Sequence, residues 1–264
     1  MDRLDELVTF IRTAKKLALF AGAGVSMRVG LPDWPRLLNN LANQLRSGNP
    51  LAAAYIDQSV RDDHLLFAAT LFSDDPKTTP HRKRELLRAE LTAQSAQPLA
   101  SLVALPFGSI FTTNFDRTLL DAYAAVHHKA PIEFHYGSTS FVGSITEPNF
   151  HVTRVHGRIE GQDPLVFSIK EYDNALKDSA YHDVLRNLFT QRQLLIVGFS
   201  FIDPAFQAVL DTIERIYASR SAGEHLALVP DDASDSFLAK LTRLNIRQLK
   251  YSPAADHADL WQLI

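Results

Sequence analysis

Two glycines separated by one residue follow the first short apolar segment of the chain. The sequence there reads Leu17-Ala18-Leu19-Phe20-Ala21, then Gly22-Ala23-Gly24-Val25-Ser26. Glycine lets the backbone turn sharply after a strand and approach a phosphate without an intervening Cβ. Met27 stands where the G-x-G-x-x-G pattern has its third glycine. The segment predicts that Gly22, Ala23, Gly24 and Ser26 contact a dinucleotide diphosphate; the alternative is a tight turn that binds no ligand.

A carboxylate and an aromatic ring come only a few residues later. The segment Gly30-Leu31-Pro32-Asp33-Trp34 is conformationally restricted by its proline. It places Asp33 and Trp34 next to the predicted phosphate loop, which makes both of them candidate binding residues.

Polar side chains also follow a second apolar segment. Thr113, Asn114 and Asp116 lie at the carboxyl end of a predicted strand. Ligands of open α/β sheets collect outside that edge, so these residues are candidate contacts. For Asp116 the alternative is a helix cap ahead of residues 117–120. Asn114 precedes the cap position and is less readily explained in that way.

Two further glycine turns complete the set of candidate motifs. In Val155-His156-Gly157, the histidine follows a strand, and its ordinary pKa suits proton transfer near neutral pH. A lone histidine is more often structural, and the chain has ten. The turn Val197-Gly198-Phe199-Ser200, with Asp203 close behind it, has a plain strand-to-helix connection as its alternative.

The elements that must position these residues alternate along the chain. Helical spacing of apolar residues predicts a helix over 4–15. Short apolar runs predict strands at 17–21, 109–113, 151–155, 165–167, 194–197, 225–229 and 246–249. Further helices are expected at 180–191, 204–218 and 234–244. This alternation predicts an α/β fold with a Rossmann-like doubly wound parallel sheet.

The stretch from Pro35 to about Ala104 contains no convincing strand. Its apolar spacing predicts a helical module, residues 35–104, inserted into a nucleotide-binding domain formed by residues 1–34 and 105–264. Within the module, His81-Arg82-Lys83-Arg84 is basic. The start of a solvated helix explains this cluster better than a nucleic-acid surface, because its flanks are not basic.

Composition narrows the class of protein. The chain has 264 residues, is 46% hydrophobic and 22% charged, and carries a net charge of −3, which gives no sign of a nucleic-acid or membrane surface. It has no cysteine, which excludes disulfides, a thiol nucleophile and cysteine-ligated zinc. The charged amino terminus does not suit a signal peptide, so a cytoplasmic protein is expected.

The ordered series of motifs resembles the sirtuin family. Each motif alone is common, but all of them occur in sirtuin order between Leu17 and Asp203. The resemblance implies that the first loop holds the diphosphate of NAD, that Asn114 and Asp116 surround the nicotinamide pocket, and that His156 is a general base. It also implies that the turn at 198–200, with Asp203, helps to bind the adenosine half.

One departure from the family decides which reaction is expected. Protein deacylases of this family carry a four-cysteine zinc module shortly after the histidine, whereas here seven residues without cysteine separate Gly157 from Leu165. No zinc is therefore expected, and peptide deacylation is disfavoured. The chain resembles instead the sirtuin-like NAD-hydrolase domains of bacterial antiphage defence systems. This resemblance implies an NAD+ glycohydrolase that releases nicotinamide and ADP-ribose and depletes NAD in abortive infection.

The chemistry assigns expected roles to four residues. Asn114 would orient the attacking water and the ribose, and His156 would act as base toward that water or a ribose hydroxyl. Either Asp33 or Asp116 would hold the nicotinamide amide or stabilise the forming cation. The sequence does not choose between the two.

The resemblance also implies regulation by assembly. A homo-oligomer is expected, or a partner such as a helicase-like hexameric ATPase of the HerA type or a short Argonaute, with no membrane and no direct nucleic-acid contact. One alternative function is an NAD-dependent protein deacylase or ADP-ribosyltransferase. Another is a non-catalytic module that senses NAD or ADP-ribose, against which the presence of both Asn114 and His156 argues.

Overall fold

A parallel sheet forms the centre of the molecule. The computed structural model describes residues 2–199, 211 and 224–264. Within these residues the sheet has the strand order β3-β4-β2-β1-β5-β6-β7, with every neighbouring pair parallel. The strands are β1 (Leu17–Ala21), β2 (Ser109–Thr112), β3 (Ile132–His135), β4 (His151–Arg154), β5 (Gln193–Val197), β6 (His225–Pro230) and β7 (Ile246–Tyr251). Because the chain builds outward from β1 first on one side and then on the other, the fold is the expected Rossmann-like doubly wound α/β sheet.

Helices cover both faces of this sheet because the central strands are apolar on both sides. In β1, Ala18 and Phe20 belong to one hydrophobic cluster, while Leu17, Leu19 and Ala21 belong to another. The first cluster is covered by α9 (Ile169–Ala175), α10 (Ser179–Gln191) and α12 (Asp235–Arg243), together with the 3-10 turn η2 (Phe141–Ile145). The second is covered by α1 (Arg3–Thr13), α7 (Ala100–Ala104), α8 (Thr118–His127) and α13 (Ala254–Leu263).

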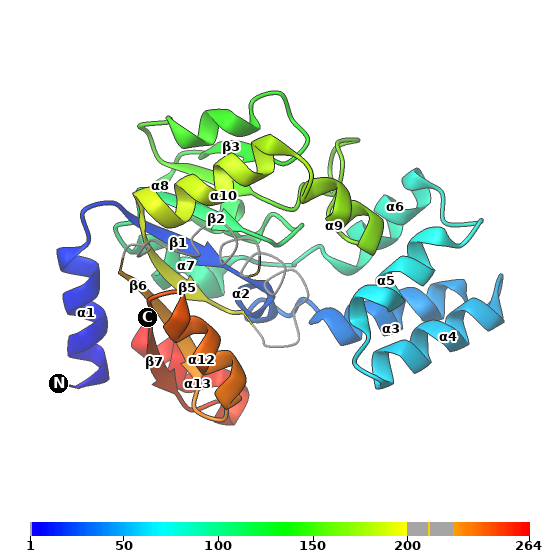
Figure 1. Cartoon of the computed structure of the whole chain (residues 1–264), viewed down its shortest axis with the longest axis horizontal. Helices are drawn as coiled ribbons and strands as arrows, with labels where there is room; N and C mark the ends of the chain where they lie inside the picture. Colours follow the sequence, from blue (N-terminus) through cyan, green and yellow to red (C-terminus); the bar gives the residue numbers. More distant parts are fainter. Residues whose placement is uncertain (1, 200–210, 212–223) are drawn as a thin grey trace.

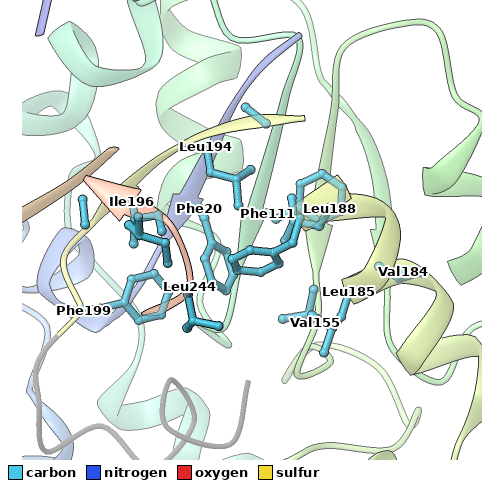
Figure 2. Close-up of a cluster of buried hydrophobic side chains, with 14 of the residues drawn as sticks. Phe20, Phe111, Val155, Val184, Leu185, Leu188, Leu194, Ile196, Phe199 and Leu244 are labelled. Atoms are coloured by element: carbon cyan, nitrogen blue, oxygen red, sulfur yellow. The ribbon is translucent and has the colours of Figure 1, made fainter. Parts of the chain in front are cut away.

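The first cluster is built around two phenylalanines on adjacent strands. Phe20 of β1 and Phe111 of β2 are register partners and lie beside Leu185 and Leu188 of α10 (Figure 2). The ring of Phe20 also meets Phe189 edge-on, with the ring centroids 5.7 Å apart. This packing fixes α10 across β1 and β2.

Four further helices pack around a third hydrophobic cluster, beside the sheet and next to α9 (Figure 1). They are α3 (Trp34–Leu45), α4 (Pro50–Arg61), α5 (Leu65–Asp74) and α6 (Pro80–Glu90), which we call the helical block. Three of them begin with a capping side chain, from Asp33, Asn49 or Thr79, that accepts a backbone N–H, and a proline lies in the first turn. Both features favour a helix start at that position.

The remainder of the predicted module, η1 (Gln97–Leu99) and α7, packs on the second cluster of the sheet instead. No strand is assigned anywhere in 35–104, all of which the structure describes. The boundaries of the predicted domain division remain a prediction.

The basic segment at the start of α6 is only half solvated. His81 and Arg82 are exposed as expected, but Lys83 and Arg84 are buried. Lys83 Nζ lies 2.8 and 2.9 Å from the two carboxylate oxygens of Glu171 in α9. The expectation of a wholly solvated cluster is therefore wrong, because half of it fastens the helical block to the helices of the sheet.

Two strand predictions differ from the structure. Residues 165–167 form no strand; Leu165 and Phe167 are apolar because they pack into the helical block's cluster. Conversely, β3 was not predicted, since this edge strand alternates apolar residues with Glu133 and His135. The predicted helix 204–218 lies outside the described residues except for Asp211. No helix in the described part of the chain is long and apolar enough to span a bilayer.

Replacing Leu188 by alanine should destabilise the fold by about 2–5 kcal/mol, because a fully buried leucine then leaves a cavity. Urea denaturation of purified protein measures the change. The matched control is Leu51→Ala at a 65% exposed position, for which less than about 0.5 kcal/mol is expected. Equal losses in the two variants would contradict this assignment of the core.

Candidate active site

The first predicted motif lies where the strand order reverses, between β1 and β5. Gly24 N donates a hydrogen bond to Gly198 O at 2.7 Å. A Cβ added to Gly24 would lie 2.8 Å from Gly198 Cα, and one added to Gly198, whose φ is +74°, would lie 2.5 Å from Val25 N. A Cβ at Gly22 would meet Gly198 O at 2.7 Å. These glycines are therefore required for the contact between the two turns, quite apart from any ligand.

Asn114 is anchored to the first of these turns. Its Nδ2 donates to Gly22 O at 2.9 Å and to Ser26 Oγ at 2.8 Å. Both amide hydrogens are thus used. Its Oδ1 accepts no hydrogen bond from any described residue, and Asn114 lines a cavity. The side chain is held rigidly while its acceptor stays available to a ligand or to water.

Asp116 completes this polar network from the other end. Its Oδ2 accepts from Ser26 Oγ at 2.7 Å, and its Oδ1 accepts from the backbone N–H of Thr118 at 2.9 Å and from the Thr118 hydroxyl. Both carboxylate oxygens are occupied at the start of α8. The N-cap residue of α8 is Arg117, so Asp116 bonds to the first turn from one residue before the cap. A ligand contact for Asp116 remains a prediction.

Two adjoining cavities open around these residues. The larger, of about 270 Å³, lies between the β1 and β5 turns and α13; the smaller, of about 40 Å³, lies between the β1 turn, the loop after β2 and α3. Ala23, Asp33 and Trp34 line both. The predicted residues among the linings are Gly24, Gly198 and Phe199 in the larger cavity and Ser26, Thr113, Asn114 and Asp116 in the smaller one.

Asp33 and Trp34 are fixed in the shared wall of the two cavities. Asp33 Oδ1 caps α3 by accepting from Arg36 N at 2.8 Å, whereas its Oδ2 accepts from no described residue. Trp34 stacks on Phe167, with the ring centroids 5.2 Å apart. Asp33 thus has a carboxylate oxygen with no hydrogen bond from a described residue, whereas each oxygen of Asp116 already accepts at least one.

His156 lies apart from this group. Its ring is fully buried against Tyr172 and Tyr181, with Nε2 3.1 Å from the Tyr181 hydroxyl, and it lines neither cavity. Burial lowers the pKa of His156 to about 3, so the ring is neutral near pH 7. Ser200 and Asp203 lie outside the described residues.

Arg154 is a positioning residue that the sequence did not reveal. It is fully buried in β4, its Nη1 donates to Phe115 O at 2.8 Å, and it pairs with Glu133 and with Glu160, the latter at 2.8 Å. It thereby holds the backbone of the loop that carries Asn114. An arginine inside a predicted buried strand was the available signal, since such a charge needs buried partners.

The carboxyl ends of β6 and β7 were also missed as parts of the site. Pro230 is the last residue of β6 and Tyr251 the last residue of β7, and both line the larger cavity. Arg28 and Trp261 line it as well. The Arg28 guanidinium lies 5.4 Å from the centre of the Trp261 ring. The rule that placed Asn114 at a strand's carboxyl end also applies to these later strands.

Comparison with known proteins gives the family. The sequence profile described as "SIR2-like domain" matches residues 108–250, more than half of the chain. The chain belongs to the SIR2-like domain family. It is 24% identical over 266 residues to the "NAD(+) hydrolase ThsA" of Bacillus cereus (strain MSX-D12). The aligned region covers 94% of this chain and 53% of that protein.

Other similar proteins extend this picture. The "NAD(+) hydrolase ThsA" of Enterococcus faecium is 24% identical over 82% of this SIR2-like chain and 44% of its own length. The chain thus spans about half the length of the curated relatives it matches. A crystal structure titled as a Sir2 homolog–NAD complex covers 99% of this chain and 92% of its own, with 17% identity and a TM-score of 0.42. The fold assignment accordingly rests on the sheet topology above.

A cysteine zinc module does not fit this SIR2-like chain. The segment between Gly157 and Leu165 has no cysteine and is fastened to α6 instead: Arg84 Nη1 donates to Arg158 O, and Arg88 Nη2 donates to Ile159 O, both at 2.9 Å. Within the described residues, no group of three or more His, Asp or Glu side chains is placed to hold a metal ion.

Gly198→Ala should lower the free energy of unfolding by more than about 1 kcal/mol, because alanine disfavours a positive φ and its Cβ would meet Val25 N. Urea denaturation measures the loss. Gly108→Ala is the control, since its Cβ would meet Leu17 O at an ordinary 3.6 Å. A Gly198→Ala protein as stable as this control would refute the close contact of the two turns.

The pKa of His156 predicts a pH dependence of stability. From pH 6.5 down toward pH 3 the unfolded chain protonates this histidine while the folded chain does not. The free energy of unfolding should therefore fall with pH in that window, by about 1.4 kcal/mol per pH unit from this group. NMR should show ring resonances of His156 that stay constant from pH 8 to pH 5 in the folded chain and titrate in urea. A folded-state midpoint near pH 6.5 would be inconsistent with the buried ring.

Proposed function

We propose that this SIR2-like chain is an NAD+ hydrolase that cleaves the bond between nicotinamide and ribose. The observation that carries the proposal is Asn114, a rigid amide with both hydrogens bonded and its oxygen free of hydrogen bonds from the described residues. It lines the smaller cavity, which adjoins the larger one at the strand switch point. Open α/β sheets bind nucleotides at that point. The names of the two ThsA relatives, at 24% identity, agree with this chemistry.

NAD would occupy the two adjoining cavities. The larger one offers the aromatic faces of Trp34, Phe199, Tyr251 and Trp261, which suit a stacked base. The Gly22–Ser26 turn would face the diphosphate. The smaller cavity, with Asn114 on its wall, would lie beside the nicotinamide ribose.

Hydrolysis requires little from the protein beyond positioning. Nicotinamide leaves from C1′ of the ribose with the bonding electron pair and becomes neutral, while a water oxygen forms the new bond to C1′. The water then loses a proton, which gives nicotinamide, ADP-ribose and H⁺. Asn114 Oδ1 would accept a hydrogen bond from that water and hold it in line with the breaking bond.

The acidic assistant is better assigned to Asp33 than to Asp116. One oxygen of Asp33 remains available in the wall of both cavities, whereas both oxygens of Asp116 are bonded within the protein. An ionised carboxylate there would stabilise the positive charge that develops on the ribose. The ring of His156 lines neither cavity, so the position of this side chain does not support its predicted role as a base. That role remains a prediction.

We further propose that the chain supplies the NAD-depleting activity of an antiphage system. Uncontrolled NAD hydrolysis would harm the host, so the activity must be restrained until infection. The matched region makes up about half of the length of the curated relatives, and the other half offers room for regulatory sequence. Homo-oligomerisation, a HerA-type ATPase and a short Argonaute are the proposed routes to control.

Asn114→Ala should reduce nicotinamide release from NAD about 100-fold or more, because it removes the group that orients water. The protein should stay folded, although losing the bonds to Gly22 and Ser26 should lower the free energy of unfolding by about 1–3 kcal/mol. Chromatographic detection of nicotinamide and ADP-ribose measures the rate. Asn174→Ala, at an exposed position of α9, is the matched control and should keep the wild-type rate.

A parallel His156→Ala variant separates two roles for the histidine. As a base, its loss lowers turnover about 10²–10⁴-fold at unchanged NAD binding. As a packing residue, its loss lowers the unfolding free energy and spares turnover. Near-normal turnover in Asn114→Ala would overturn the proposed mechanism.

A further inference from the structure

A third cavity lies at the amino ends of the central strands, whereas the candidate active site lies at their carboxyl ends. It has a volume of about 680 Å³ and is lined by residues next to the amino ends of β1 and β2 and by the end of α10. Volumes of this order are typical of small-molecule sites. None of the sequence motifs described above reaches this cavity.

The lining of this cavity has an excess of positive charge. Lys15, Lys16 and Arg192 line it, with Glu147 as the one acidic residue among them. Glu147 Oε1 already accepts from the backbone N–H of Asn149 at 2.9 Å and from its side chain at 2.8 Å, and these bonds lower the pKa of Glu147. No ion pair within the described residues joins any of the three cations to a carboxylate.

Arg192 is the fixed member of this group. Its Nη2 donates to Ser144 O at 3.2 Å, and its guanidinium carbon lies 5.3 Å from the centre of the Phe111 ring. Its Nε is buried and has no hydrogen-bond partner within the described residues. Burial lowers the pKa of Arg192. A partly buried guanidinium with no counter-charge is unfavourable, and an anion that reached it would offset the desolvation.

The rest of the lining suggests what kind of anion fits. Ile11, Pro106 and Ile145 offer apolar surface, and the side-chain amides of Asn187 and Gln191 offer hydrogen bonds. We propose that this cavity is a binding site for a small organic anion, in which a phosphate or carboxylate pairs with Arg192 and an apolar portion contacts the surrounding wall. The site is separate from NAD hydrolysis and does not depend on the proposed function.

Titration of the full chain with phenyl phosphate, followed by amide NMR, tests the proposal. We expect saturable shifts at Ser144, Arg192 and Lys16 that persist in the presence of NAD. Neutral benzyl alcohol should bind at least about tenfold more weakly, because it lacks the charge. Benzoate and inorganic phosphate are the further probes. Stronger binding of phenyl phosphate than of benzoate identifies a phosphate site, and the reverse order identifies a carboxylate site.

Variants locate the binding. Arg192→Gln should weaken phenyl phosphate binding at least about tenfold. Lys16→Gln, at an exposed position that does not endanger folding, should weaken it about threefold. Lys129→Gln, at an exposed lysine just after α8, is the charge-matched control and should bind as wild type. Equal binding of phenyl phosphate and benzyl alcohol, no saturable shifts, shifts confined to Gly24 and Gly198, or undiminished binding in both variants would overturn the proposal.

Discussion

The close contact between two backbone turns, one after β1 and one after β5, determines the geometry of the candidate site. Gly24 and Gly198 approach so closely that neither has room for a Cβ. Since Asn114 donates to the carbonyl of Gly22, the amide follows wherever this first turn is placed. The same rigid pair of turns therefore positions both the larger cavity and the polar network around Asn114.

Buried charge supplies the second constraint. Arg154 is completely enclosed, and its guanidinium pairs with carboxylates from β3 and from the loop after β4 while it holds the carbonyl of Phe115. A buried cation tolerates few arrangements, because its charge must keep a carboxylate partner and its N–H groups must keep acceptors. The loop that carries Asn114 is therefore held at two points: Arg154 binds the carbonyl of Phe115, and Asn114 itself binds the carbonyl of Gly22. This double attachment suits a residue whose proposed task is to orient water.

The sequence could predict what local pattern determines. Apolar runs ending in glycine or polar residues located β1, β2, β4 and β5 and put Asn114 and Gly198 at one edge of the sheet. It could not predict features that depend on distant partners. The strand-like segment at 165–167 packs against helices and forms no strand. The polar residues of β3 alternate with apolar ones, so this strand has no apolar run by which it could be recognised. Lys83 is buried with Glu171 as its ion-pair partner, which lies 88 residues away in the sequence. The burial of His156 likewise depends on Tyr181 in a helix that the motif does not contain.

The fastening of the helical block through Lys83, Arg84 and Arg88 has a thermodynamic consequence. Asp33 and Trp34 sit where the block leaves the sheet, and Leu37 from the block closes the small cavity. The cavity thus exists in full only while the block is docked. Any molecule that binds there must favour the docked arrangement over an opened one by RT ln(1 + [L]/Kd), about 2.7 kcal/mol at a concentration 100 times its Kd. By reciprocity, whatever loosens those basic side chains from Glu171 of α9 and from the loop after β4 would lower affinity at the start of α3.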